Sequence, residues 1–488
     1  MLLLIGLLTS LLLSPMLQAA PPPLFEITAG GKTVELHDFP GGVFGQVEIA
    51  RPTEIEVRAH FDIRWVDIRP KSAGIAPQIA PDHGSFRFRL DRPLPLTIEF
   101  NGEWQRVIHL FGNPPETNPL QPGTPHVRYF GPGLHEPGLI ELKDNETLYL
   151  AEGAWVKGIV ASVGTKNIAI RGRGVLDGSG IPRRRPAGPQ SQDAQPAPLP
   201  PPSAAAVNYG TRRNMIYLEG AENALVEGIT IVNSQTWTFN ARRSNGLRVD
   251  GIRILNGHGP CSTDGIDLVS SSDALVQNVF IRTNDDNIVV KNLDDRDVHD
   301  ISVRKSVLWN EPCGNALEIG FELRSAPIHK ILFQDIDIIR VERGSAISIH
   351  NGDSSTVQDI TFDNIRVEDV RHKLIDFALL YGQYGPDRPA DRAEIAARMD
   401  RGGAWDGVLR STPEQKTALA NGRGHIRNIL VKNLQVLEGL PFSILSGWDE
   451  DHAVENVIIE GMTWQNRPIH NAVEGEFSVD HAPGLTFR

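Results

Sequence analysis

Residues 259–291 read GPCSTDGIDLVSSSDALVQNVFIRTNDDNIVVK and hold an isolated carboxylate, Asp264, and a vicinal pair, Asp285 and Asp286. The pair follows Asp264 by 21 and 22 positions, with a strand-like segment at 274–281 between them. That separation is about one coil of a β-solenoid, whose coils run roughly 20–30 residues. Residues one coil apart stack at about the 4.8 Å strand spacing. The three carboxylates are therefore predicted to cluster on one face of a solenoid.

A repeated unit supports the solenoid interpretation. Each unit is an apolar alternation, a polar bend and a second apolar alternation, as in ALVEGITI at 224–231 and ITFDNIRV at 360–367. One unit cannot bury its apolar side alone, whereas a stack buries a continuous core. Without long helices between the strands, the pattern favours a parallel β-helix over a doubly wound sheet, with an all-β sandwich array as the alternative. The bends are Gly228, Gly251, Asn278, Ser306, Asp335, Asn364, Asn433 and Gly461.

The composition agrees with a turn-rich β protein. The 488 residues include 46 Gly and 35 Pro, and only 22% are charged. The net charge is −12, and no basic stripe indicates nucleic acid as a partner. An anionic polymer is still compatible with this charge, because a local basic cleft can override the global sign.

The chain is divided by its patterns into three parts. Residues 1–20 contain no charged side chain and are predicted to be a signal peptide, with an uncleaved anchor as the alternative. A secreted or periplasmic protein without membrane association after cleavage is expected. Residues 21–122 alternate at period two between Gly, Pro and Asp turns, which predicts an antiparallel β-sandwich. Residues 123–488 are predicted to be the β-helix.

Two insertions interrupt the repeats. The first, near 181–207, is rich in Pro, Arg, Ala and Gln and is predicted to lack fixed structure. Its arginine run at 183–185 is either a grip for an acidic glycan or a solvated loop. The second, near 371–424, contains a short helix predicted to start at Asp391. Its aromatic residues are predicted to wall a sugar cleft, or else to lie on a surface excursion: Tyr381, Tyr384 and Trp405.

Four short segments resemble the motifs of polygalacturonase-type glycoside hydrolases, family 28, in the pectinase-like superfamily. They are NSQTWT at 233–238, STDGID at 262–267, NDDN at 284–287 and GNALEIG at 314–320. The resemblance implies a right-handed parallel β-helix and hydrolysis of polysaccharide glycosidic bonds with inversion. The sandwich before a β-helix, joined through YFGPG at 129–133, also resembles the dextranase and isopullulanase group, family 49. A dextranase-like α-glucan hydrolase is therefore the alternative.

The resemblance also assigns the three carboxylates. It implies Asp285 as the general acid, with Asp264 and Asp286 holding the nucleophilic water, and it implies neither a cofactor nor a metal. The chemistry asks for such residues in any case, since glycoside hydrolysis needs one carboxylic acid and one carboxylate. Neighbouring carboxylates raise one another's pKa, which keeps the acid protonated. Vicinal residues of a strand point to opposite faces, so the pair must lie at a bend. The alternative is that these residues cap solenoid turns, the role expected for Asp267 and Asp273.

The substrate-binding motifs depart from those of the family. Asn315 stands where the family has His, Glu318 replaces its Ser, and the expected Arg-Ile-Lys tripeptide is absent; the comparable coil reads SIHNG at 348–352. These departures favour a neutral glycosyl unit at the cleavage point, from an α-glucan or a pectic branch, over a uronate, whose carboxylate needs a cation. The predicted substrate contacts, each with a structural role as alternative, are Asn315, Glu318, Lys291, His350 and Trp237.

Two rival functions and one cysteine prediction complete the sequence analysis. A calcium-dependent polysaccharide lyase would use the three Asp oxygens for Ca²⁺ and Lys291 or Arg282 as base. A non-catalytic glycan-binding solenoid is the other rival. Cys261 and Cys313 are 52 residues, about two coils, apart. Their Cα atoms are then expected about 9.6 Å apart, beyond the reach of a disulfide. Free thiols are predicted, and the oligomeric state is left open.

Overall fold

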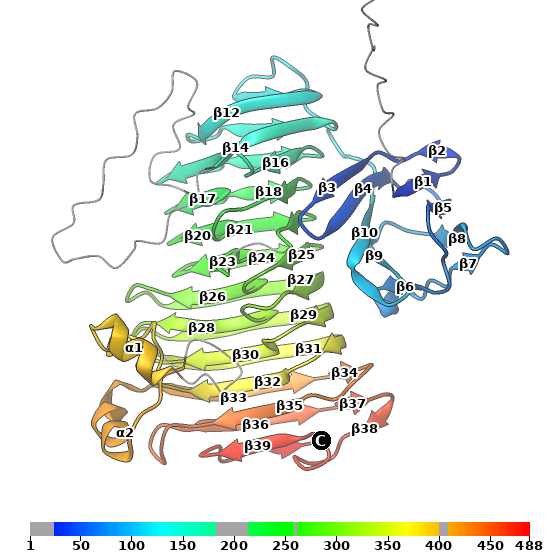
Figure 1. Cartoon of the computed structure of the whole chain (residues 1–488). Coiled ribbons are helices and arrows are strands. Elements are labelled where there is room, and N and C mark those ends of the chain that lie inside the picture. The colour runs from blue at the N-terminus through cyan, green and yellow to red at the C-terminus, as the bar shows by residue number, and fades with distance from the viewer. Residues whose placement is uncertain (1–23, 182–212, 258–260, 400–407) are drawn as a thin grey trace, which may run out of the picture.

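The computed structural model describes residues 24–181, 213–257, 261–399 and 408–488, which form a small two-sheet sandwich beside a long β-helix (Figure 1). The predicted signal peptide, the arginine run at 183–185 and Trp405 lie outside these residues. In the part of the chain that is described, no helix has the length and apolar character needed to cross a membrane.

The sandwich is built from two five-stranded sheets whose apolar side chains face each other. Along β5 and β8 buried and exposed residues alternate, as the period-two pattern predicted. One pairing differs from the antiparallel prediction, because β4 and β10 are parallel. The first sheet contains β1 (Phe25–Ala29), β2 (Lys32–Thr33), β5 (Thr53–Ala59), β7 (Gln78–Ile79) and β8 (Ser85–Leu90), and the second contains β3 (Leu36–Phe39), β4 (Gly42–Glu48), β6 (Val66–Arg69), β9 (Pro95–Phe100) and β10 (Glu103–Asn113).

The β-helix is one continuous 30-stranded sheet, almost wholly parallel, which confirms the predicted right-handed parallel β-helix. Its core is a column of stacked Ile, Leu, Val and Phe side chains from every coil. The face that carries the candidate site contains β17 (Ile216–Glu219), β20 (Phe239–Arg242), β23 (Ile266–Val269), β26 (Ile288–Asn292), β28 (Leu317–Leu323), β30 (Ser345–Asn351), β32 (Lys373–Leu379), β35 (Phe442–Ser446) and β39 (Phe477–Asp480).

The other two faces complete each coil. The second face contains β11 (Val127–Phe130), β13 (Thr147–Leu150), β15 (Ala169–Gly172), β18 (Leu225–Glu227), β21 (Asn245–Asp250), β24 (Ser272–Gln277), β33 (His425–Lys432), β36 (Val454–Glu460) and β40 (Thr486–Phe487). The third contains β16 (Val175–Asp177), β19 (Thr230–Val232), β22 (Arg253–Leu255), β25 (Phe280–Thr283), β34 (Gln435–Val436) and β37 (Thr463–Trp464), which also pairs with β38 (Arg467–Pro468). Five long strands turn a corner between faces: β12 (Gly133–Glu141), β14 (Ala154–Val163), β27 (Val298–Asn310), β29 (Ile328–Val341) and β31 (Thr356–Val370).

Residues in the left-handed backbone conformation, with positive φ, form the bends predicted from the repeat. Gly228, Asn278 and Asn364 have φ of 76°, 55° and 55°, a region that glycine and asparagine tolerate best. The prediction is wrong by one position in the fourth coil, where Lys305 and not Ser306 has positive φ, at 52°. Polar and apolar residues alternate on both sides of this bend, so the pattern fixes the bend but not its exact residue.

Helices occur mainly in the second predicted insertion. α1 (Arg392–Arg398) begins at Asp391, whose side chain accepts a hydrogen bond from the Ala393 N–H, as predicted. α2 (Pro413–Leu419) follows, with Thr412 and Gln415 forming a capping box. Two short 3₁₀ turns span Lys71–Ala73 and Ala420–Gly422.

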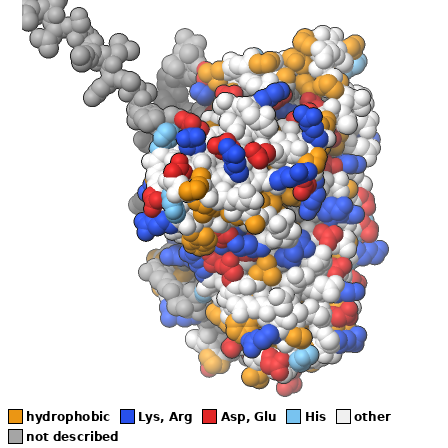
Figure 2. Space-filling view, turned by 90° about the vertical axis from the view of Figure 1, so that its right-hand side faces the viewer, with side chains coloured by type: hydrophobic (Ala, Val, Ile, Leu, Met, Phe, Trp, Pro, Cys, Tyr) orange, Lys and Arg blue, Asp and Glu red, His pale blue; other side chains and the backbone are white. Residues whose placement is uncertain are grey.

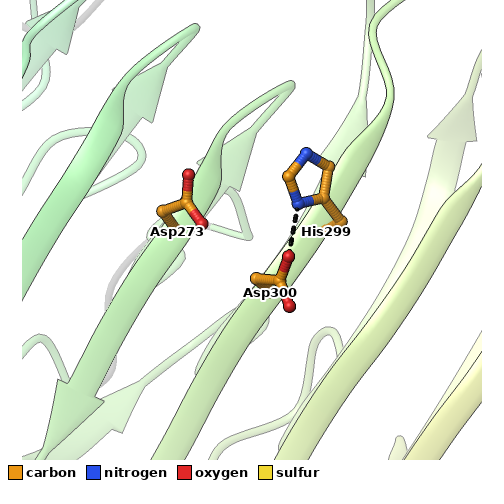
Figure 3. Close-up of side chains that lie close together, drawn as sticks. All are labelled: Asp273, His299 and Asp300. Atoms are coloured by element: carbon orange, nitrogen blue, oxygen red, sulfur yellow. Dashed lines mark hydrogen bonds and ion pairs between the residues drawn. The ribbon is translucent and has the colours of Figure 1, made fainter.

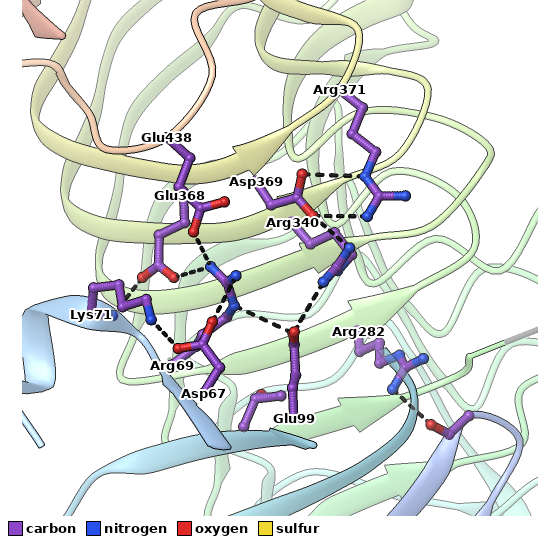
Figure 4. A network of polar contacts seen from close by, with 12 residues as sticks. Asp67, Arg69, Lys71, Glu99, Arg282, Arg340, Glu368, Asp369, Arg371 and Glu438 are labelled. Carbon is purple, nitrogen blue, oxygen red and sulfur yellow. Dashed lines mark hydrogen bonds and ion pairs between the residues drawn. The ribbon is translucent and has the colours of Figure 1, made fainter. Parts of the chain in front are cut away.

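An ion network joins the sandwich to the β-helix (Figure 4). At its centre the buried guanidinium of Arg69, on β6, contacts two sandwich carboxylates, Asp67 at 3.0 Å and Glu99 at 3.3 Å. The same group contacts two β-helix carboxylates, Glu368 at 2.6 Å and Glu438 at 3.0 Å. Arg340 of the β-helix returns to Glu99 at 3.1 Å. Beside this network, apolar residues of the sandwich and the β-helix pack together in one buried cluster, which includes Phe44, Phe111, Phe280 and Trp309.

Candidate active site

The three predicted carboxylates lie at equivalent turns of neighbouring coils. Asp264 stands just before β23, and Asp286 stands just before β26. The Gly265 N–H donates to the Asp286 carbonyl at 2.8 Å, and the Asn287 N–H donates to the Asn315 carbonyl at 2.9 Å. The coil spacing inferred from the sequence therefore stacks Asp286 on Asp264, with Asn315 one coil further.

Asp264, Asp285 and Asp286 bring carboxylate oxygens within 4.8 Å of one another. The vicinal pair faces the same side because residues 284–287 form a bend between β25 and β26. In that bend Asp285 Oδ1 accepts a hydrogen bond from the Asp286 N–H at 3.0 Å. Asp264 and Asp286 are only 2% and 6% exposed, whereas Asp285 is partly exposed. Asp285 is therefore the carboxyl best placed to reach a bound glycan.

Burial and mutual repulsion favour retention of a proton in this cluster. Burial, Asp267 and Asp285 raise the pKa of Asp264 well above its usual value. Burial, Asp285 and Glu318 do the same for the pKa of Asp286, and burial raises the pKa of Asp285 although Lys291 opposes it. Three carboxylates this close cannot all ionise cheaply. A protonated acid beside a carboxylate is the state that general acid–base catalysis requires.

A chain of buried hydrogen bonds holds Asp286. Its Oδ1 accepts from the Asn315 backbone N–H at 2.7 Å and from Asn315 Nδ2 at 3.3 Å. Asn315 Nδ2 also donates to Glu318 Oε2 at 3.1 Å, and Glu318 accepts from Ser348 Oγ. Asn315 and Glu318 are 1% and 0% exposed. Their hydrogen bonds therefore suit a role in orienting Asp286 better than a role in direct contact with the sugar.

His350 continues the chain as a charged group. Its Nδ1 lies 2.9 Å from Glu318 Oε2, and its Nε2 lies 3.1 Å from Asp376 Oδ2. Burial alone would lower its pKa, but Glu318 and Asp376 raise the pKa of His350 to about 9. Lys373 also pairs with Asp376. His350 is 1% exposed, and carboxylates on both sides neutralise its charge. Its contacts therefore suit a role in holding Glu318 better than a role in binding the sugar.

Lys291 and Trp237 pack together on the other side of the carboxylate cluster, beside Asp264. The Lys291 ammonium lies 3.7 Å from Asp264, 3.9 Å from Asp267 and 3.3 Å from Glu322, and 4.2 Å from the centre of the Trp237 ring. Although burial opposes it, Glu322 and Asp264 raise the pKa of Lys291 well above its usual value. Lys291 is therefore a permanent cation that offsets part of the carboxylate charge. Trp237 is partly exposed and retains a face near the cluster.

The structure corrects the expected role of Asp267 and shows where Tyr384, one of the aromatic residues predicted to wall a cleft, lies. Asp267, expected to be a turn residue, is fully buried and faces Lys291; the turn-like sequence around it hid this role. Tyr384 of the second insertion is 43% exposed, and its ring lies 5.7 Å from that of Phe321. Burial of its hydroxyl end, reinforced by Asp285 and Glu322, raises the pKa of Tyr384 to about 12. Tyr381 is instead buried in the core, so of these two tyrosines it is Tyr384 that fits the predicted wall.

The Asp267 carboxyl gives a pH-dependent prediction. Burial, opposed by Lys291 and reinforced by Glu322, raises its folded-state pKa from 3.8 to about 7. Its proton therefore stabilises the fold fully below about pH 4, and this contribution is lost as the pH rises through 7. Asp267→Asn stays neutral at every pH. The melting temperature of this variant minus that of the wild type is therefore expected to increase from pH 4 to pH 8. Thermal scans across that range test this, with the exposed Asp273→Asn as control. A constant difference between Asp267→Asn and the wild type contradicts the prediction.

The cysteine prediction is wrong. Cys261 and Cys313 form a disulfide, with their Cα atoms 5.6 Å apart. The estimate of two coil spacings assumed positions in the regular ladder. Both residues lie instead in turns that precede strands, and such turns are not held at the strand spacing. The disulfide links the turn before Asp264 to the turn before Asn315.

Gly314, next to Cys313, packs directly on the acidic pair. It has φ of 67°, and a Cβ there would lie 2.3 Å from Asp286 N and 2.5 Å from Asp285 Oδ1. Gly314→Ala must therefore move the pair, and we expect kcat to fall at least tenfold because small displacements of catalytic groups cost large factors. Steady-state kinetics tests this. Gly164→Ala is the control, since Gly164 has φ of 62° but no atom within 4 Å of the added Cβ. Equal losses in both variants would attribute the effect to backbone strain alone.

A second group of polar side chains lies on the surface of another face of the β-helix (Figure 3). Asp273, His299 and Asp300 are within 4.8 Å of one another, and His299 Nδ1 lies 2.7 Å from Asp300 Oδ2. Asp273 and Asp300 have φ of 52° and 54°, so they are bend residues of successive coils. The turn role expected for Asp273 agrees with this geometry.

Comparison with known proteins shows the family to which the chain belongs. The family model described as glycosyl hydrolases family 28 matches residues 139–388, just over half of the chain, and includes all three carboxylates. The chain belongs to family 28. Two curated relatives are a probable polygalacturonase from Arabidopsis thaliana, 22% identical over 39% of this chain and 41% of its own length, and a polygalacturonase from Cochliobolus carbonum, 24% identical over 33% and 43%. The match thus spans about two fifths of each relative's length.

Solved structures show the same fold. Dex49A from Penicillium minioluteum superposes with a TM-score of 0.59 at 14% identity, over 95% of this chain and 93% of its own. An exopolygalacturonase from Thermotoga maritima gives a TM-score of 0.51 at 19% identity, over 74% and 83%. The first match covers both sandwich and β-helix, the architecture on which the resemblance to the dextranase group rested.

Proposed function

We propose that this family 28 protein is a glycoside hydrolase that cleaves glycosidic bonds of a polysaccharide. The observation that carries the proposal is the convergence of Asp264, Asp285 and Asp286 from two coils, with oxygens within 4.8 Å, on residues matched by the family model. Structural capping alone does not account for them, because Asp264 Oδ1 is buried without a hydrogen-bond partner among the described residues. A buried polar atom without a partner calls for an explanation, and a catalytic role is one of those that apply to it.

The roles follow from exposure and contacts. Asp285, partly exposed, donates its proton to the leaving glycosidic oxygen. Water attacks the anomeric carbon as that bond breaks, and its proton passes to Asp264 or Asp286. The hydrogen bonds from Asn315 hold Asp286 ready to accept it. Lys291 stays protonated and limits repulsion among the carboxylates.

Inversion at the anomeric carbon rests on the family. The nearest oxygens of the three carboxylates lie within 4.8 Å of one another, which is shorter than the roughly 6.5–9.5 Å between the carboxyl groups of most inverting glycosidases. Proton NMR of the first product anomer decides between the two outcomes. A product of retained configuration would make one carboxylate a nucleophile and leave hydrolysis itself intact.

The lyase alternative has little support from the charges. A lyase base must accept a proton, but the neighbouring carboxylates keep Lys291 protonated. Arg282 is fully buried, pairs with Glu311 and donates to the Gly41 carbonyl of the sandwich at 2.9 Å. It is therefore turned away from the acidic cluster. Near-ultraviolet absorbance of the products and loss of activity with a chelator would favour the lyase.

We expect the sugar at the cleavage point to be neutral. Each cation at the site is already paired with carboxylates: Lys291 with Asp264, His350 with Glu318, and Lys373 with Asp376. A uronate there would meet several further carboxylates, and an unpaired buried charge is costly. Catalytic efficiencies on polygalacturonate, dextran and branched pectic fractions test this. Higher efficiency on polygalacturonate than on every neutral or mixed glycan would refute the expectation.

The decisive experiment for the activity is a screen of purified protein against a polysaccharide panel with reducing-end detection. Release of reducing ends supports hydrolysis, whereas binding without release supports the glycan-binding alternative. Secretion is a separate proposal that rests on the apolar segment at 2–13, and N-terminal sequencing of the exported protein tests it.

A further inference from the structure

A groove of about 1020 Å³ runs between the sandwich and the β-helix, apart from the acidic cluster. One wall comes from the sandwich and the linker after it, including Arg92 and Pro114. The other wall follows the bend column of the β-helix, including Gly228, Gly251 and Asn278. Figure 2 faces the sandwich, and Lys and Arg side chains gather along its border with the β-helix.

The carboxylates that line the groove are already engaged. Glu116 accepts from Tyr149 Oη at 2.7 Å, and Asp335 accepts from Asn364 Nδ2 at 2.5 Å. The other lining carboxylates each pair with a neighbouring arginine: Glu227 with Arg171 at 2.6 Å, Asp250 with Arg248 at 2.8 Å, and Asp337 with Arg366 at 2.6 Å.

Four of the cationic side chains that line the groove have no carboxylate partner among the described residues. Within the described ranges, no carboxylate oxygen lies within 4.0 Å of Arg92, Arg173, Arg253 or Lys305. Arg253 is only 6% exposed, yet its donors meet neutral acceptors: the carbonyls of Gly228 and Gly251 and the side-chain oxygen of Asn113. Burying a cation without a counter-ion is costly.

The Arg173 guanidinium adjoins Arg253 across Gly228. A Cβ on Gly228 would lie 2.8 Å from Arg173 Nη1, and Arg253 Nη1 donates to the Gly228 carbonyl at 3.3 Å. Arg173 itself donates to the Pro114 carbonyl at 3.1 Å. Burial and Arg173 lower the pKa of Arg253 to about 9 although the charge of Asp250 opposes them, so no anion lies close enough to Arg253 to offset its burial. An anionic ligand would relieve both the desolvation and the repulsion.

We propose that this groove is a second, non-catalytic site for an anionic glycan segment, in which Arg253 and Arg173 bind a uronate carboxylate. Guanidinium groups match the planar carboxylate through paired hydrogen bonds. The exposed Arg92 and Lys305 would guide the chain along the groove. The volume is at the upper end of the roughly 300–1,000 Å³ of small-molecule sites, which suits several sugar units. The ligand class rests on the proposed action on polysaccharide; a neutral cleavage point and an anionic groove together indicate a mixed polymer.

Binding of galacturonate hexamer tests the proposal, in an Asp285→Asn background that prevents turnover. The Arg92→Gln/Arg173→Gln/Lys305→Gln variant is expected to bind at least tenfold more weakly by calorimetry. A control with the same charge change, Lys32→Gln/Arg51→Gln/Lys143→Gln, alters exposed residues outside the groove and is expected to stay within twofold. Arg253→Gln, checked for folding by circular dichroism, is expected to lose affinity as well. Equal losses in both triple variants, or none in the groove variant, overturn the proposal.

Two further measurements distinguish a glycan site in the groove from a simple anion site and from the catalytic site. Inorganic phosphate that binds as tightly as the hexamer would show a simple anion site and overturn the glycan assignment. With Asp285 intact, the groove triple variant is expected to keep its kcat on a short neutral glycan. Hexamer binding that depends on the groove, without hydrolysis of any glycan, would support this site while refuting the proposed activity.

Discussion

Asp285→Asn is expected to lower kcat by about 10²–10⁴-fold, the range for loss of a general acid. The amide has the shape of the carboxylic acid but cannot donate the proton that the leaving oxygen needs. Asp285 Oδ1 accepts the Asp286 N–H, a hydrogen bond that the asparagine oxygen can keep. The fold and most of the substrate affinity are therefore expected to remain.

The measurement is kcat on the best glycan from the polysaccharide panel, beside substrate binding by calorimetry. Asp451→Asn makes the same Asp-to-Asn change at an exposed residue of the last coils and is expected to leave turnover unchanged. Wild-type turnover in purified Asp285→Asn would remove Asp285 as the acid. The candidate would then move to Asp264 or Asp286, whose pKa values are raised further by burial and their neighbours.

Arg69→Leu is expected to destabilise the contact between sandwich and β-helix by about 3–5 kcal/mol, the cost of removing one partner from a buried ion pair. Arg69 is 5% exposed and neutralises Asp67, Glu99, Glu368 and Glu438. Glu368 is also fully buried, and burial already raises its pKa to about 7 against the pull of Arg69. Without the guanidinium these carboxylates have to take up protons or water.

Urea titration followed by tryptophan fluorescence measures the loss. Arg89→Leu is the control, because its ion pair with Asp91 is largely exposed and such pairs contribute little. An Arg69→Leu midpoint equal to that of the wild type would mean that the network adds no net stability. A loss that shrinks at pH 4, where Glu368 is protonated because its pKa is about 7, would confirm that its stranded charge contributes to the loss.

The sequence alone was enough to determine the β-helix and the meeting of its three carboxylates. Both follow from periodicity: each apolar unit is stable only when stacked, and stacking brings residues one coil apart side by side. The spacing from Asp264 to Asp286 thus implied that their side chains meet. The bend at 284–287 was likewise required, since a straight strand separates vicinal side chains.

The turns and the pairing of charges were decided only by the tertiary structure. Cys261 and Cys313 lie in turns, where no ladder of hydrogen bonds fixes the spacing, so coil counting placed them too far apart. Asp267 looked like one more turn residue, yet it faces Lys291 in the interior. The charge of His350 depends on Glu318 and Asp376, which lie in the preceding and following coils. A sequence gives the identity of each ionisable group, but its protonation depends on burial and on partners that only the folded chain brings within reach.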